Sequence, residues 1–143
     1  MPSLATLTIA ALVDRSGVEA EAIESYRRLG LLSKPRRTAD GLLLYPPDEV
    51  GRVVFIRRAL DLGFSAVAIG EMIGLGCRKL PTCKDIHAIA ERQLADVRRR
   101  RADLDRIERM LTPLVASCPR AAARDDCNII AALSHHVPGK DGP

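Results

Sequence analysis

The stretch Thr8–Leu32, TIAALVDRSGVEAEAIESYRRLGLL, decides how the amino-terminal part of the chain folds. Thr8 is a preferred helix N-cap, and Ser16-Gly17 interrupts the helical pattern before a second run from Glu19 to Leu29. Two short helices joined by a glycine turn form a helix-turn-helix, whose second helix lies in the major groove of DNA. Any helical hairpin needs similar spacing, so a purely structural hairpin is the alternative. The apolar residues that define the two inner faces are Ile9, Leu12, Val13, Val18, Ala22, Ile23 and Tyr26.

A loop and a short pair of strands are predicted between Leu31 and Tyr45, after Gly30 ends the second helix. This segment has the character of a wing beside the helix-turn-helix. The local charge is basic, because no acid lies between Arg27 and Arg37. Such a patch suits contact with phosphates, and a solvated surface loop is the alternative. The five cations of the patch are Arg27, Arg28, Lys34, Arg36 and Arg37.

Three further helices are predicted downstream of the wing. Pro46-Pro47-Asp48 begins one that ends at Gly63, and Ser65 caps the next. Thr82-Cys83-Lys84-Asp85 resembles a capping box, so a long helix begins at Cys83, and Pro113 is expected to end it. Such a helix is about 45 Å long, at 1.5 Å per residue.

The long helix is expected to be a dimeriser. Its apolar residues recur every three or four positions, and an antiparallel coiled coil between two chains would bury them. The run Arg98–Arg101 surrounds more than one helix face, and the pairs Asp96–Arg100, Arg101–Asp105 and Asp105–Arg109 are spaced for ion pairing. We interpret this run as solvated and ion-paired, with nucleic-acid binding as the alternative.

Three cysteines are expected at loop or helix-start positions, which suit ligands better than core fillers. Cys83 is the first residue of the long helix, and Cys127 follows Asp126, which we expect to cap a last short helix. Cys118 lies between them, near Arg120. The alternative for each is a small buried apolar residue.

A single chain cannot bring all three thiols together if the long helix is intact. The segment from Pro113 to Cys118 spans at most about 20 Å, which is far short of the helix length. Antiparallel pairing would place Cys83 of one subunit beside Cys118 and Cys127 of the other, giving two sites per dimer. Three thiolates without an imidazole suit mercury, lead or cadmium better than zinc, although Cys77 offers a possible fourth ligand.

Composition limits the classes of protein to consider. The chain has 143 residues, a net charge of +4 and 47% hydrophobic residues, so one folded domain with an arm is expected. Two Phe, two Tyr and no Trp argue against a platform that stacks single-stranded bases. No transmembrane segment or signal peptide is evident, and a cytoplasmic protein without membrane association is expected.

The order of these elements resembles the MerR family of metal-responsive transcriptional regulators across residues 6–134. The cysteine spacings of 35 and 9 residues are the most specific feature and are similar to those of the mercury-sensing members. The resemblance also rests on Thr8-Ile9-Ala10, Tyr26–Leu32, Tyr45, Leu62–Ser65, Leu94–Arg98 and Ala102-Asp103-Leu104.

The resemblance implies a homodimer that binds a dyad operator in double-stranded promoter DNA. It would repress without metal and activate with it by distorting the duplex, with RNA polymerase as a further partner. Mercury(II) is the effector it implies, with lead, cadmium or zinc as alternatives, held by Cys83, Cys118 and Cys127. The residues expected on DNA are Tyr26, Arg27, Arg28, Arg36, Arg37 and Tyr45.

The expected fold is mostly α: a winged helix-turn-helix, a coiled-coil helix and a cysteine-bearing tail. Where the family has arginine, an aromatic residue and arginine, this chain has Glu24, Ser25 and Leu44, so its operator or affinity is expected to differ. A thiol redox switch and a metal-binding dimer without DNA binding are the alternatives, and no catalytic site is evident. The predicted segments are 6–75 for DNA binding, 76–82 as a loop, 83–112 as the dimerisation helix, 113–134 for metal binding and 135–143 as a flexible tail.

Overall fold

The computed structural model describes residues 6–76, 78–121 and 123–134. The predicted tail over 135–143, with its two histidines, and Cys77 lie outside the described residues. The chain divides into two compact units, one up to Gln93 and one from Leu94 onward. Within the described residues, no helix combines the length and the apolar character that a membrane span requires.

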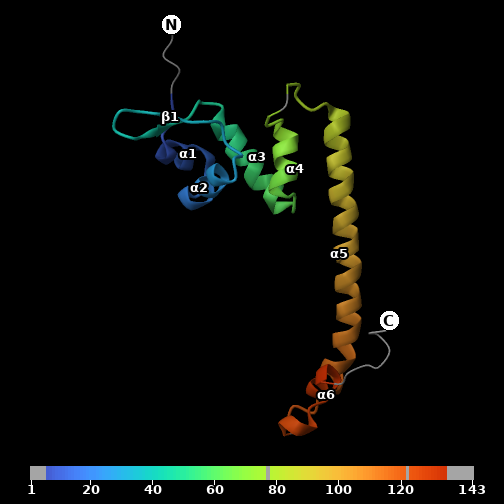
Figure 1. Cartoon of the computed structure of the whole chain (residues 1–143). Helices are drawn as coiled ribbons and strands as arrows, with labels where there is room; N and C mark the ends of the chain where they lie inside the picture. The colour runs from blue at the N-terminus through green and yellow to red at the C-terminus, as the bar shows by residue number, and fades with distance from the viewer. Residues whose placement is uncertain (1–5, 77, 122, 135–143) are drawn as a thin grey trace. The chain divides into compact units, whose positions relative to one another are not determined.

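The predicted helix-turn-helix is present as α1 (Ile9–Ser16) and α2 (Ala20–Arg28) (Figure 1). The Thr8 hydroxyl caps α1 by accepting a hydrogen bond from the Ala11 N–H at 3.2 Å. Gly17 ends α1 with a φ of +72°, a conformation that glycine adopts without steric cost. Two helices therefore meet at the turn that the sequence predicted.

The wing consists of β1 (Arg36–Arg37) and β2 (Leu43–Leu44), which pair antiparallel. Thr38 shapes the connecting loop, because its hydroxyl accepts from the Leu42 N–H at 3.0 Å. A bridge between Leu7 and Tyr45 fastens the end of the wing to the segment before α1.

Two more helices complete the core of the first unit, α3 (Glu49–Asp61) and α4 (Ala66–Ile73). The Ser65 hydroxyl caps α4 by accepting from the Ala68 N–H at 3.1 Å, as predicted. α3 packs against α1, α2 and α4. The buried apolar residues that these helices share with the wing are Leu7, Leu12, Val18, Ile23, Tyr26, Leu31, Leu32, Tyr45, Val53, Ile56, Ala59 and Ile69.

The long helix α5 (Cys83–Ser117) begins where the sequence predicted and ends later. The Thr82 N–H donates to Asp85 Oδ2 at 2.9 Å, and the Asp85 N–H donates to Thr82 Oγ1 at 3.2 Å, which completes the capping box. The expectation that Pro113 ends the helix is wrong. Proline removes one helical donor, but this part of α5 is exposed, so water can satisfy the carbonyl that is left.

The first part of α5, as far as Gln93, belongs to the first compact unit. Ile89 is buried, and the Gln93 side-chain amide donates to the Leu62 carbonyl at 2.8 Å. The ion pair between Arg92 and Glu71 spans 3.5 Å.

The second part of α5 carries exposed apolar side chains that fit the predicted coiled coil. Asp96 pairs with Arg100 at 2.9 Å, as predicted, while the pairs expected at Asp105 are not among the ion pairs of the described residues. The exposed large apolar residues of this segment are Leu94, Val97, Leu104, Ile107, Met110, Leu111 and Val115.

The carboxy-terminal end folds back on the end of α5 through η1 (Arg124–Asp126) and α6 (Asn128–Ser134). The Asn128 amide donates to the Leu114 carbonyl at 3.1 Å and to the Ser117 hydroxyl at 2.7 Å. The expectation that Asp126 caps the last helix is wrong. Asp126 belongs to the preceding 3-10 turn, and α6 begins at Asn128.

Candidate nucleic-acid interface and metal site

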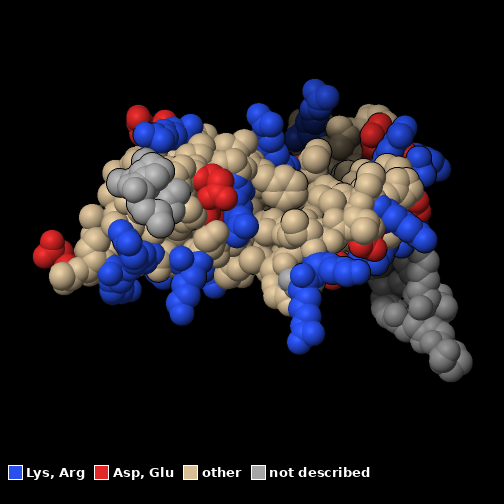
Figure 2. Space-filling model, turned by 90° about the horizontal axis from the view of Figure 1, so that it is seen from above, with Lys and Arg blue, Asp and Glu red and all other residues tan. Residues whose placement is uncertain are grey.

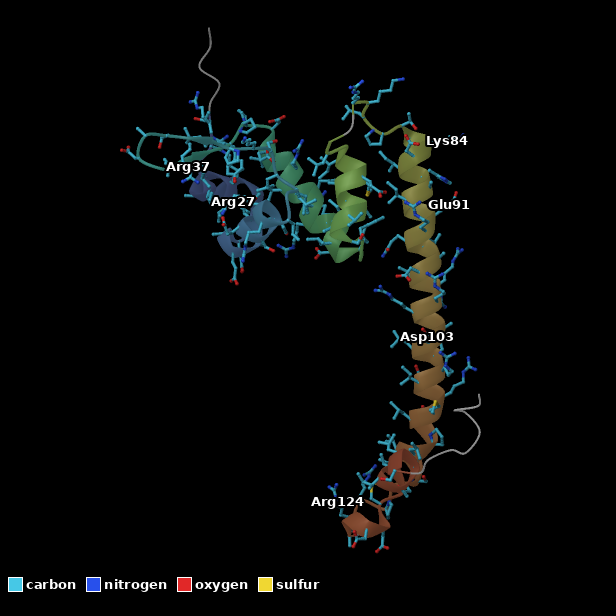
Figure 3. All side chains as sticks on the ribbon, viewed as in Figure 1. Arg27, Arg37, Lys84, Glu91, Asp103 and Arg124 are labelled. Carbon is cyan, nitrogen blue, oxygen red and sulfur yellow. The ribbon has the colours of Figure 1, made fainter. Side chains whose placement is uncertain are left out.

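The second helix of the helix-turn-helix turns one face into the core and the other outward. Ile23 and Tyr26 are buried and fix α2 against the core. Arg28 is exposed, and the Arg27 side chain is 38% exposed (Figure 3). The helix therefore presents polar side chains to solvent on the face that a helix-turn-helix offers to DNA.

An ion pair within α2 joins Glu24 to Arg27. Arg27 Nε donates to Glu24 Oε2 at 3.1 Å, and Arg27 Nη2 donates to the second carboxylate oxygen. The hydrogen bond from Arg27 lowers the pKa of Glu24 despite some desolvation, and the charges of Arg27 and Arg28 lower it further. The same hydrogen bond raises the pKa of Arg27. The two side chains thus act as one charge-neutral unit.

The wing offers two more exposed cations. Arg36 and Arg37 are exposed on β1, opposite Leu44 and Leu43 (Figure 3). No ion pair is found for either arginine among the residues described here. Figure 2 shows Lys and Arg side chains spread over the visible face with Asp and Glu among them.

The two tyrosines predicted on DNA are both buried. Tyr45 has no exposed surface, and its hydroxyl has no hydrogen-bond partner among the described residues. Tyr26 is 4% exposed. Burial raises the pKa of both phenols, so both are neutral at physiological pH. Their side chains belong to the core that supports α2 and the wing.

Cys127 occupies the N-cap position of α6. Hydrogen bonds from the backbone N–H groups of Ile130 and Ile129 lower the pKa of its thiol, and a hydrogen bond from Cys118 and the charge of Arg124 lower it further. A low thiol pKa favours the thiolate, which is the form that binds metal ions.

The structure brings two of the three predicted thiols together. Cys118 follows the end of α5 and is hydrogen-bonded to Cys127, and both are half-buried. Cys83 is exposed at the first residue of α5, and the helix that separates it from Cys118 has 35 residues. Within the described parts of one chain, no group of three or more metal-binding side chains exists.

Sequence reasoning missed two residues that shape these sites. Asn128 fastens Cys127 to the end of α5, and no local pattern marks it, because its partners lie 11 and 14 residues away. Glu24 pairs with Arg27, a contact that the sequence analysis does not include. The spacing of three residues on a helix was the available signal.

Comparison with known proteins gives consistent matches along most of the chain. A family model described as MerR HTH family regulatory protein matches residues 7–74, and a second, described as MerR, DNA binding, matches residues 50–114. A mercuric resistance operon regulatory protein of Bacillus cereus is 38% identical over 125 residues, which are 87% of this chain and 95% of that protein. A protein of the same name from Pseudomonas fluorescens is 36% identical over 131 residues, or 92% and 90% of the two chains.

A solved structure also matches the chain. The transcription regulator PbrR691 from Ralstonia metallidurans CH34, crystallised in complex with lead(II), aligns with a TM-score of 0.76. Its sequence is 26% identical, and the alignment covers 90% of this chain and 99% of PbrR691.

Proposed function

We propose that this chain, which belongs to the MerR family of DNA-binding transcriptional regulators, is a homodimeric switch that controls a promoter in response to mercury(II). The observation that carries the proposal is the pair of neighbouring thiols, Cys118 and Cys127, which follow the end of α5. Cys83 is the first residue of α5. A regulator of this kind works in the cytoplasm, where promoter DNA is found.

The metal site would form across the dimer. Antiparallel pairing of two α5 helices buries their exposed apolar side chains and places Cys83 of the partner subunit beside Cys118 and Cys127. Soft thiolate ligands without imidazole or carboxylate favour mercury(II) over harder ions. The low pKa of Cys127 keeps one sulfur ready for binding at neutral pH. The names of the two mercuric resistance relatives support the same metal.

DNA binding would place α2 in the major groove and the wing along the backbone. Arg27, Arg28, Arg36 and Arg37 would contact phosphates, while Tyr26 and Tyr45 would hold these elements in position from the core. Such contacts fix the protein on the duplex without specifying sequence.

The switch would work by changing the shape of the bound DNA. Moving a population from 1:99 to 99:1 takes about 5.5 kcal/mol of differential binding, and bending DNA costs of order 1–10 kcal/mol. Bonds between metal and thiolate supply free energy of this size. When three thiolates from two subunits bind the metal ion, the segment that carries Cys118 and Cys127 would be drawn onto the partner's α5. This movement would distort the bound promoter, and RNA polymerase would then use the distorted DNA.

A reporter assay tests the proposal and the choice of metal. Cells carrying the gene and its own promoter fused to a reporter are exposed to mercury, lead, cadmium or zinc at equal sublethal concentrations. Mercury(II) is expected to give the strongest induction, and Cys83→Ser, Cys118→Ser or Cys127→Ser each to abolish it. If lead, the metal in the PbrR691 complex, gives stronger induction than mercury, then lead and not mercury is the effector. Induction without any metal after peroxide treatment would favour a thiol redox switch.

A further inference from the structure

Glu24 lies on the outward half of α2, on the side of Arg27, and is half-exposed. At about 100° per residue, Glu24 points away from the direction shared by the buried Ile23 and Tyr26. Glu21 and Arg28 lie on the same outward face and are exposed. The face that a helix-turn-helix turns to the major groove therefore carries carboxylates as well as arginines.

The charge of this helix is unusual for a DNA-reading element. α2 contains two acids, Glu21 and Glu24, and two bases, Arg27 and Arg28, so its side-chain charge is 2 − 2 = 0. A carboxylate is repelled by phosphate, and among base edges in the major groove it accepts well only from the cytosine amino group.

The pairing also occupies the edge of Arg27 that suits a phosphate. The donors Nε and Nη2 both point to the Glu24 carboxylate. Arginine binds phosphate through the same kind of fork, with two parallel N–H donors. One guanidinium edge cannot serve a carboxylate and a phosphate at once.

From these contacts, and resting on the proposed DNA binding, we propose that Glu24 is a positioning residue that holds Arg27 away from the phosphates. The pair weakens sequence-independent binding to duplex DNA, because it occupies one edge of the Arg27 guanidinium.

Duplex binding by the full-length chain tests this inference. The probe is a short mixed-sequence duplex with a fluorescent label, titrated with the parent, Glu24→Gln and Glu21→Gln proteins between about 50 and 200 mM salt. Glu21→Gln is the matched control, since it removes one exposed acid from the same helix and Glu21 has no ion pair among the described residues. Thermal melting checks that all three proteins fold.

We expect Glu24→Gln to bind up to about fivefold more tightly than Glu21→Gln, as one released exposed ion pair allows. Its plot of log affinity against log salt is expected to steepen by about 0.9 for each Arg27 that gains a phosphate. Adding Arg27→Gln should cost more affinity in the Glu24→Gln chain than in the parent.

Two results would overturn the inference. Equal effects of Glu24→Gln and Glu21→Gln, with no change of salt slope between them, would show that only net charge matters. Equal costs of Arg27→Gln in the two backgrounds would show that Glu24 does not restrain Arg27. If the parent and every variant fail to bind duplex DNA at low salt, the proposed function itself is wrong and the inference falls with it.

Discussion

Mixing two defective proteins tests whether the metal site is shared between subunits. One protein carries Cys83→Ser, and the other carries Cys118→Ser together with Cys127→Ser. At 1.5 Å per residue, the 35 residues of α5 span about 50 Å, which is why the proposed site takes Cys83 from the partner subunit. Neither homodimer then contains a three-thiol site, whereas a mixed dimer contains one site with all three thiols and one with none.

The expected recovery follows from counting subunits. Random re-pairing of equal amounts gives mixed dimers for half of the population, and each mixed dimer has one complete site out of two. The mixture should therefore regain roughly one quarter of the three-thiol capacity of the parent protein.

Mercury(II) titration in excess small thiol provides the assay, with mercury–sulfur absorption in the ultraviolet as the signal. The competing thiol suppresses binding by one or two sulfur atoms, and the proteins are mixed unfolded and then refolded together. Each variant refolded alone is the control. A mixture that binds no more than its separate components, or a Cys83→Ser protein that retains the parent's capacity, would refute a site shared across the dimer.

Three further predictions concern local features of the fold. Thr8→Ala should lower the free energy of unfolding by about 1 kcal/mol, measured by denaturant titration, because α1 loses its cap, whereas Thr8→Ser should keep it. Asn128→Ala should speed amide hydrogen exchange across α6 and leave α1 unchanged, because the two hydrogen bonds to the end of α5 are lost. In the metal-free protein, alkylation of Cys127 should reach its plateau at a lower pH than alkylation of free cysteine, because the lowered pKa extends the thiolate to lower pH; identical profiles would contradict the capping role.

Helix starts were predictable from sequence because the signals are local. Thr8, Ser65 and the Thr82–Asp85 box each bind backbone groups within three residues, and the structure confirms all three. The wing was predictable for a similar reason, since a short stretch between glycine and proline signals has few alternatives.

Features that depend on distant or competing partners were not predictable. The burial of Tyr45 depends on its bridge to Leu7 and on packing of the helices, so no neighbouring residue marks it. Asp126 looked like a helix cap, but Cys127 takes that position and Asn128 anchors the helix from within. Pro113 does not end α5, because an exposed helix can leave the carbonyl that lacks a partner hydrogen-bonded to water.

The structure also suggests how a signal from the thiols would reach DNA. Cys83 begins α5, and the next turns of α5 belong to the same compact unit as α2 and the wing. Ile89 in this stretch is buried, and the Gln93 side-chain amide donates to the carbonyl of Leu62, the residue that follows α3. α3 in turn packs against α2. A pull on Cys83 from a shared metal would therefore act on the helix next to the DNA-reading element. Replacing Gln93 with alanine should weaken metal-dependent induction and leave the affinity of the protein for the metal unchanged. If induction and metal affinity fall by the same factor, Gln93 instead stabilises the metal site itself.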